Sequence, residues 1–148
     1  MTELVLPSHT NQLGNIFGGQ IMAWIDIAGA IAAGRHAEGV CVTASIDTLH
    51  FVAPVKLGHV VNIYSSVNYA HKTSMEIGVR VESEDPNTQQ RRHVATAYLT
   101  FVALDPHGHP RPVPGLTPTS AHEKRRYSEA QLRRKSRLAL KAALNRKK

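Results

Sequence analysis

Hydrophobic and polar positions follow two different periods along the chain, and the period changes near residue 40. Residues 20–34 are rich in Ala and Ile, and Asp26 is the only charge from residue 21 to residue 34. Turn-forming residues precede this segment, and Gly34 and Arg35 at its end suit a helix C-terminus. The pattern predicts a helix that is apolar on all sides and too short to span a bilayer. We therefore expect it to be the central helix of a core.

From residue 40 onward the apolar positions alternate and are rich in β-branched residues, which predicts strands. Pro54, Pro86 and Pro106 mark the breaks between or after these segments. Short connections between them predict an antiparallel meander. One helix followed by long strands favours an α+β fold, in which an antiparallel β-sheet wraps around the central helix. The predicted strands are residues 3–6, 40–52, 59–70, 73–83 and 93–104.

The last third of the chain changes composition twice. Residues 106–118 contain five prolines and predict an extended linker. Residues 120–144 return to helix-forming composition, with Ser120 as a candidate N-cap. We divide the chain into a domain of residues 1–118 and a basic helical C-terminal tail of residues 119–148. We expect the tail to dock through a loose apolar stripe, which consists of Tyr127, Ala130, Leu138 and Ala142.

The net charge of +7 belongs to the tail. Residues 122–148 hold 11 of the 18 Lys and Arg and only two acids, so residues 1–121 have a net charge of −2. This distribution disfavours a uniformly basic nucleic-acid-binding body. An RNA-binding role of the tail is an alternative, but Tyr127 is its only aromatic residue for base stacking. No stretch reaches the ~20 apolar residues of a membrane span and no signal-peptide layout is present, so we expect a soluble, cytoplasmic protein.

Residues 8–33, SHTNQLGNIFGGQIMAWIDIAGAIAA, carry a resemblance to a known family. The segment resembles the signature of hotdog-fold acyl-CoA thioesterases, in the cytosolic family that includes bacterial YciA-type enzymes and the vertebrate brain acyl-CoA hydrolase. Asn11 lies in the loop, Gly14, Gly18 and Gly19 form the turn into the helix, and Asp26 follows Asn11 by 15 positions. Residues 42–61 and 91–105 resemble the family as well, and the similarity covers about residues 5–135.

The resemblance implies a hotdog fold with a basic C-terminal helix, and an enzyme that hydrolyses acyl-CoA to a free carboxylic acid and CoA. It implies no metal and no cofactor, because CoA is part of the substrate. Sites in this family lie between two hotdog units, which implies at least a homodimer, with Asn11 and Asp26 of one site from different subunits. Relatives assemble into hexamers as trimers of dimers. A non-catalytic module that binds acyl-CoA is the alternative.

The candidate catalytic residues fit thioester hydrolysis, which needs an activated water and a stabilised oxyanion. Gly18 and Gly19 offer free N–H groups at a helix N-terminus. Burial among apolar neighbours would strengthen Asp26 as a base, although a direct attack that forms a mixed anhydride stays open. The Asn11 amide would hold the water or the carbonyl oxygen. The structural alternatives are a capping or ion-paired carboxylate for Asp26 and an ordinary turn asparagine for Asn11.

The CoA end of the substrate needs a basic docking surface. The resemblance implies that the loop before the third long strand touches the ligand, and Lys72, Thr73 and Ser74 supply a cation and two hydroxyls there. Arg92, beside Arg91, is a further candidate for the phosphates. Each of these residues could instead be a solvated turn residue.

Other polar residues point to no further chemistry. His107 and His109 lie in the proline-rich loop without a companion Cys or acidic cluster, so we predict no metal site. Cys41 is interpreted as a buried small hydrophobe. Thr43 and Ser45 either line an acyl tunnel or are the ordinary hydroxyls of a half-exposed strand.

Overall fold

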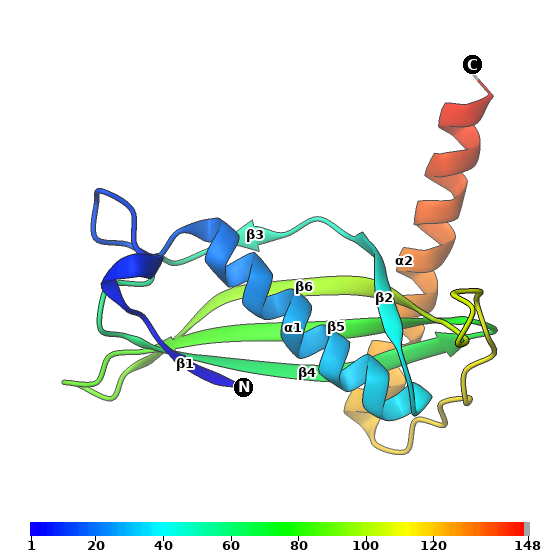
Figure 1. Ribbon diagram of the computed structural model, residues 1–148, viewed down its shortest axis with the longest axis horizontal. Helices are drawn as coiled ribbons and strands as arrows, with labels where there is room; N and C mark the ends of the chain where they lie inside the picture. Colours follow the sequence, from blue (N-terminus) through cyan, green and yellow to red (C-terminus); the bar gives the residue numbers. More distant parts are fainter. Residues whose placement is uncertain (147–148) are drawn as a thin grey trace.

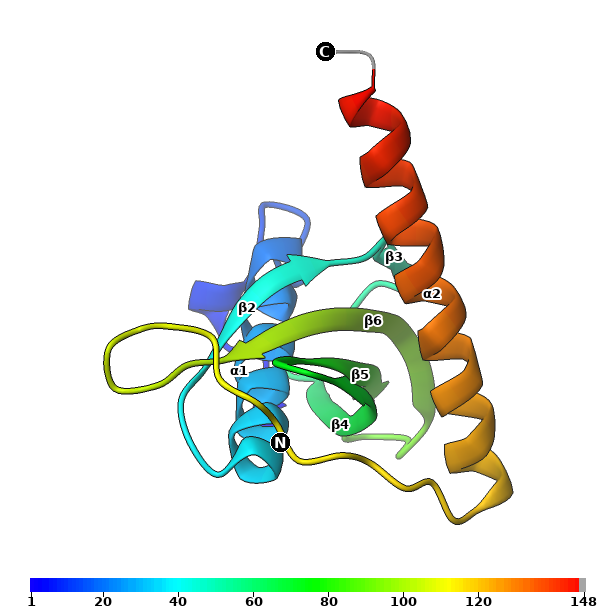
Figure 2. The same ribbon diagram turned by 90° about the vertical axis from the view of Figure 1, so that its right-hand side faces the viewer.

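A curled antiparallel sheet separates two helices in the computed structural model, which describes residues 1–146 (Figure 1). Helix α1 (Gly18–Ala37) lies in the concave face of the sheet, and helix α2 (Ala121–Asn145) lies on the outer face (Figure 2). Neither helix is both long and apolar enough to cross a membrane. The predicted α+β architecture, a sheet wrapped around one helix with a basic C-terminal helix, is confirmed.

The sheet has the order β1-β4-β5-β6-β2, and β3 pairs with β6 beside β2. The meander prediction is confirmed for β4, β5 and β6, which pair in sequence order. It is wrong for β2, which pairs with β6 at the far edge instead of with β4. The predicted strand 40–52 is divided, because the chain leaves the ladder at Asp47. The strands are β1 (Thr2–Leu4), β2 (Cys41–Ile46), β3 (His50–Phe51), β4 (Val60–His71), β5 (Ser74–Glu84) and β6 (Arg91–Ala103).

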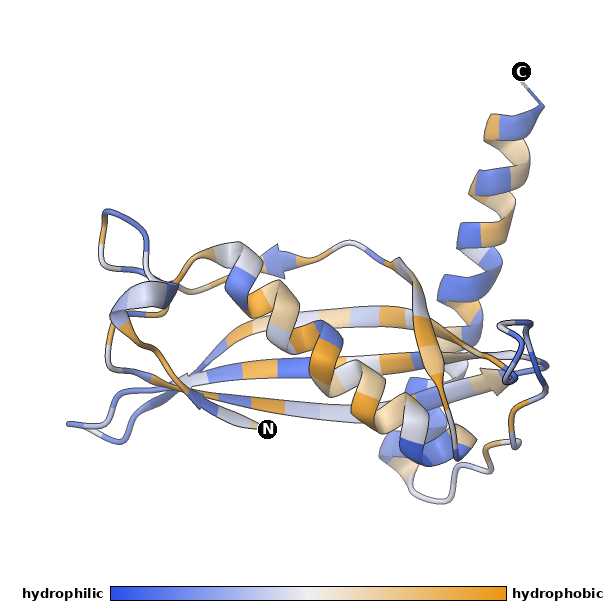
Figure 3. Cartoon of the chain, in the orientation of Figure 1, coloured by the Kyte–Doolittle hydropathy of each residue, from blue (hydrophilic) through white to orange (hydrophobic). Residues whose placement is uncertain are grey.

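Helix α1 buries one face and exposes the other. Ile21, Trp24 and Ile25 are buried in the main core together with apolar side chains of β4, β5 and β6. Met22 and Ile27, in contrast, are 43% and 50% exposed. The expectation of a helix buried on all sides is therefore not met within one chain, and Figure 3 shows an apolar stretch on the side of α1 turned away from the sheet.

The helix ends three residues later than the sequence suggests. Glu38, with φ of 52°, is its C-cap, so Gly34 and Arg35 lie inside α1. The backbone N–H of Gly39 donates to the Gly34 carbonyl, 3.2 Å away, and closes the helix end. Arg111 of the linker also donates to the carbonyl of Ala37, at 2.7 Å. The proline-rich linker is irregular, as predicted, but it packs against this end of α1.

Helix α2 begins as predicted, and its expected apolar stripe docks in part. The Ser120 hydroxyl accepts from the N–H of Glu123 at 3.1 Å, and the Glu123 carboxylate accepts from the N–H of Ser120 at 3.0 Å. This capping box fixes the helix start. Of the predicted apolar stripe, Tyr127 packs against Tyr69 of β4 and Ala130 is fully buried, whereas Leu138 is 47% exposed. An ion pair between Arg133 and the buried Glu76 on β5 adds to this docking.

Candidate active site

Asp26 lies in the middle of α1 and is held by the edge strand β2. The Thr43 hydroxyl donates to Asp26 Oδ1 over 2.5 Å. Pairing of β2 with β6, in which Thr43 faces Phe101, fixes the position of this threonine. From the sequence, Thr43 is either a tunnel residue or an ordinary strand hydroxyl, because its contact with Asp26 depends on how β2 lies across α1. One carboxylate oxygen is thus oriented, and Oδ2 is available to a water or a substrate.

The surroundings of Asp26 are apolar and open. Within one chain Asp26 is half-buried, and the neighbouring α1 residues Met22, Ile27 and Ile31 are exposed. A soluble protein rarely leaves such a contiguous apolar stripe in contact with water, and a stripe of this kind marks an interaction surface. The burial of Asp26 that the sequence predicts therefore requires a cover that one chain does not supply.

The N-terminus of α1 carries no side-chain cap. Phe17 is the N-cap residue and offers no side-chain acceptor, so the first N–H groups of the helix stay available. At Gly19, a Cβ atom would lie 2.5 Å from Phe17 Cε1, which means that glycine lets this ring lie against the first turn. A Cβ atom at Gly18 would lie 3.6 Å from the ring of Phe51. The helix terminus can therefore receive negative charge between two aromatic rings.

Asn11 folds the loop that leads into α1. Its side-chain oxygen accepts from the N–H of Leu13 at 2.9 Å and of Asn15 at 3.3 Å. Its backbone carbonyl accepts from Gly14, which has a φ of +73°. Asn11 therefore shapes this turn. Since the oxygen is engaged in the turn, the side-chain NH₂ group is the part that can donate to a ligand.

One chain does not bring Asn11, Gly19 and Asp26 to a common point. Asp26 follows Gly19 by seven residues, which places it about 10 Å further along the helix axis. Asn11 precedes Gly19 in the loop before the helix, on the side away from Asp26. A reacting carbonyl must lie about 3 Å from both its attacking group and its oxyanion donors. A site that uses all three residues therefore takes them from two chains.

The candidate CoA-binding residues lie at opposite ends of the sheet. Lys72 and Thr73 form the tight β4–β5 turn, where Lys72 has a φ of 48° and Ser74 Oγ donates to the carbonyl of His71. Arg92 faces Ser83 at the β5–β6 end. About ten strand residues, or roughly 33 Å, separate the two ends. Lys72 and Arg92 of one chain cannot contact the same phosphate group.

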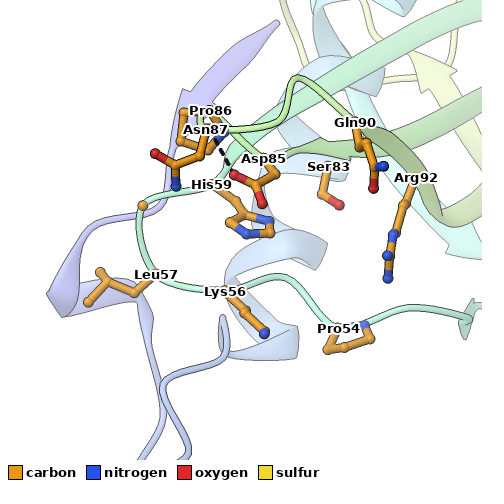
Figure 4. Close-up of a pocket in the computed structure, with 11 residues that line it drawn as sticks. Pro54, Lys56, Leu57, His59, Ser83, Asp85, Pro86, Asn87, Gln90 and Arg92 are labelled. Atoms are coloured by element: carbon orange, nitrogen blue, oxygen red, sulfur yellow. Dashed lines mark hydrogen bonds between the residues drawn. The ribbon is translucent and has the colours of Figure 1, made fainter.

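Arg92 lines a cavity of about 400 Å³ (Figure 4). Lys56 and His59 line it too, and His59 Nδ1 is buried there without a hydrogen-bond partner. The backbone N–H of Asn87 donates to the Asp85 carboxylate at the rim, which lowers the pKa of Asp85. The sequence pattern indicates Arg92 but not Lys56 and His59, because the cavity joins separate segments. The rest of its lining consists of Pro54, Leu57, Gly58, Ser83, Pro86 and Gln90.

This cavity adjoins the Asn11 loop. Lys56 forms a β-bridge with Asn15, and the N–H of Leu57 donates to the carbonyl of Gly14 at 3.1 Å. The cations at Arg92 and Lys56 therefore lie on the same side of the molecule as the N-terminus of α1. Lys72, in contrast, is tied through its carbonyl to Val113 of the linker, near the C-terminal end of α1.

Residues 1–146 contain no group of three or more His, Cys, Asp or Glu side chains that could hold a metal ion. The Asp105 carboxylate accepts from the backbone N–H groups of His107 and His109, both at 2.9 Å, and so shapes their turn. Cys41 is partly buried, and this burial raises the pKa of its thiol. An unreactive Cys41 agrees with that direction.

A curled antiparallel sheet closed around one long helix is the architecture of the hotdog class of proteins. Residues 13–89 match the family model described as the thioesterase superfamily. The chain belongs to this superfamily.

Relatives with known names agree with this assignment. The chain is 43% identical over 137 residues to acyl-coenzyme A thioesterase 11 of Mus musculus. The aligned region covers 92% of this chain but only 23% of the mouse protein. The fold of the chain matches a crystal structure of a hexameric acyl-CoA thioesterase with a TM-score of 0.92, at 41% identity and over 96% of this chain and 91% of the other.

An acyl-CoA hydrolase from Staphylococcus aureus, solved with butyryl-CoA and CoA, is 38% identical with a TM-score of 0.90, over 99% of this chain and 89% of the other. Three variants of that enzyme have been solved, in which an asparagine, an aspartate or a threonine is replaced by alanine. Its aspartate follows its asparagine by 15 residues, and its threonine follows the aspartate by 17. Asn11, Asp26 and Thr43 have the same spacing.

Proposed function

We propose that the protein hydrolyses acyl-CoA thioesters to a free carboxylic acid and CoA, with Asp26 as the catalytic carboxylate. The observation that carries this proposal is the placement of Asp26, which Thr43 orients within the open apolar face of α1. The shared spacing of Asn11, Asp26 and Thr43 with the three residues replaced in the Staphylococcus aureus enzyme supports the choice of residues. A carboxylate that served only as a helix cap would lie at an end of α1 and not at its centre.

The active unit in this proposal is a pair of chains. The edge strand β2 exposes unpaired backbone groups, and the apolar face of α1 lies on the concave side of the same edge. Two copies that pair through β2 would place their α1 helices side by side and cover both surfaces. Such an arrangement lets Asn11 and Gly19 of one chain face Asp26 of the other. Further assembly of pairs into a hexamer, as in the hexameric relative, is part of the proposal.

The reaction follows from the roles of these groups. The acyl carbonyl accepts from the N–H of Gly19, where the positive end of the helix dipole stabilises the developing oxyanion. The NH₂ group of Asn11 donates to the same oxygen or to the attacking water. Asp26 removes a proton from water as the water oxygen attacks the carbonyl carbon. The tetrahedral intermediate then collapses, the carbon–sulfur bond breaks, and the CoA thiolate leaves and takes up a proton.

A nucleophilic route uses the same residue. Asp26 Oδ2 would attack the carbonyl carbon, release the CoA thiolate and leave a mixed anhydride that water hydrolyses. A single turnover in ¹⁸O-labelled water distinguishes the routes. Under general-base catalysis the label enters the carboxylic acid product in the first turnover. In the anhydride route, water that attacks the Asp26 carbonyl leaves the label on the protein.

We place the CoA phosphates at the cavity of Arg92, Lys56 and His59, because it lies on the side of the Asn11 loop and gathers two cations. Lys72, Thr73 and Ser74 form a second candidate surface, which would serve a ligand that enters from the opposite end. Arg92→Ala should raise KM for acyl-CoA and leave KM for an acyl-pantetheine thioester unchanged, since the latter lacks the nucleotide. Lys72→Ala is the matched variant. If only Lys72→Ala raised KM, the CoA phosphates would instead be assigned to the β4–β5 turn.

The test of the whole proposal is Asp26→Asn, which keeps the shape and removes the base. Its kcat should fall at least ~10²-fold, while the circular dichroism spectrum and the melting temperature stay close to those of the parent. Asn11→Ala should lower kcat more than it raises KM. A purified parent protein that binds acyl-CoA without turnover would make the chain a binding module. Full activity of Asp26→Asn would remove this residue from the chemistry.

A further inference from the structure

Helix α2 is anchored to its own chain only as far as Arg137. Arg133 donates to both carboxylate oxygens of Glu76, at 2.7 Å and 3.1 Å, and its guanidinium lies 3.6 Å from the centre of the Tyr98 ring. Earlier in the helix, the rings of Tyr127 and Tyr69 meet edge to face at 5.0 Å. These contacts cross the outer face of β4, β5 and β6 toward the β2 edge.

The last anchor is Arg137, which donates to both oxygens of Asp47 at 3.2 Å. Asp47 directly follows β2, the edge strand of the sheet. From residue 138 to residue 146 every residue is exposed. Figures 1 and 2 both show this part of α2 projecting past the β2 edge. We call residues 138–146 the overhang, and its length is about 12 Å.

The helix face that docks on the sheet continues into the overhang. Ala130, Arg133 and Arg137 recur at intervals of three and four residues and all face the body. The same interval from Arg137 leads to Leu140, Lys141 and Leu144. Leu140 and Leu144 are 61% and 57% exposed in the single chain. The docking face thus extends beyond the last strand with two leucines that have nothing beneath them.

We propose that the overhang packs on the outer side of a second copy of this chain, joined at the β2 edge. This inference rests on the pair of chains described under the proposed function. If the sheet of a second copy continued the curved sheet beyond β2, its outer side would lie under Leu140 and Leu144, on the docking face of α2. The unpaired edge of β2 and the exposed face of α1 both call for a partner at that edge. Helix α2 would then act as a strap across the seam between two copies.

The occupant is a second copy and not an unrelated protein, because one neighbour at one edge accounts for three open surfaces. These are the β2 backbone, the apolar side of α1 and the leucine face of the overhang. The first lies within the sheet, the second on its concave side and the third on its outer side. A partner that covers all three must itself be a sheet with an open edge, which this chain provides.

The test compares the full-length parent with two variants by sedimentation equilibrium at several concentrations. Leu140→Ala combined with Leu144→Ala should weaken association of the pair by about tenfold or more. Leu132→Ala is the matched control, because Leu132 lies on the anchored part of α2 and is 65% exposed there. This variant should associate like the parent. Hydrogen exchange in residues 138–146 of the parent should speed up on dilution below the dissociation constant of the pair.

Each outcome decides a different point. Equal association of the parent and both variants, with an intact pair, would overturn the strap and leave the proposed function standing. A hexamer that falls into stable pairs in the Leu140/Leu144 variant would assign the overhang to contacts between pairs, which also overturns the strap. A parent chain that is monomeric and fully active would instead overturn the pair on which both proposals rest. Circular dichroism that shows full helix content confirms that each variant is folded.

Discussion

Replacement of Arg133 by methionine should strongly destabilise the protein, because it leaves a buried charge without its partner. The Glu76 side chain is only 4% exposed, and Asn68 is its other side-chain donor, at 3.2 Å. Removal of one member of a buried ion pair typically costs 3–5 kcal/mol. Arg133 itself is 23% exposed, and methionine keeps an apolar contact with Tyr98, so we expect the lower end, about 3 kcal/mol.

The assay is urea unfolding at fixed protein concentration, followed by circular dichroism, because association contributes to apparent stability. Arg125→Met is the matched control on the same helix. Arg125 pairs with Glu129 at 3.0 Å, but both side chains are solvent-exposed, at 59% and 39%, so we expect a loss of about 0.5 kcal/mol or less. In a thermal experiment the difference corresponds to roughly 5–10 °C for a chain of this size.

A double variant identifies the buried charge as the cause. Combining Arg133→Met with Glu76→Gln should recover most of the lost stability, since the neutral amide removes the uncompensated charge. Equal losses in Arg133→Met and Arg125→Met, or no recovery in the double variant, would refute the reasoning.

Three other outcomes follow from the site and the helix cap. Thr43→Ala should lower kcat about tenfold, less than Asp26→Asn, because it removes one hydrogen bond to the carboxylate; steady-state kinetics checks this. Gly19→Ala should lower kcat while the melting temperature is unchanged or higher, since the exposed Phe17 ring can move away from the new methyl group. The hydrogen bonds of the cap lower the pKa of Glu123 from 4.5 to about 2, so its stabilising effect is complete above pH 4.5 and is lost toward pH 2. Glu123→Gln should therefore lower the melting temperature at pH 7 and make no difference near pH 2.

Local sequence patterns predicted most helices and strands, but they did not predict how all the strands pair. The hairpins β4–β5 and β5–β6 follow from alternation and short turns, and Ser120 follows from the capping rule. The position of β2 does not follow, because a strand can reach either edge of a meander and no local pattern encodes which one. The bulge between Thr43 and Ser45 also results from pairing with β6.

The candidate site shows the same limit. Asn11, Gly19 and Asp26 were found because they lie in one continuous segment that resembles a family signature. Thr43, Lys56 and His59 reach the site or the cavity through contacts between distant segments. The exposure of Met22 and Ile27 was missed for a related reason, because an apolar helix looks the same in sequence whether its own sheet or a second chain covers it.

The pairing of β2 with β6 also determines the order in which the chain can acquire its native contacts. Synthesis releases α1 and β2 first, but the strand that supports β2 ends at Ala103 and emerges more than fifty residues later. During this interval the apolar faces of α1 have no sheet to pack on, and such exposed segments are where nascent chains aggregate or bind chaperones. The β4–β6 hairpins involve local contacts and can form rapidly, whereas closure by β2 joins distant segments and is slow. The contact between Thr43 and Asp26 is therefore a late event in the folding of each newly made molecule.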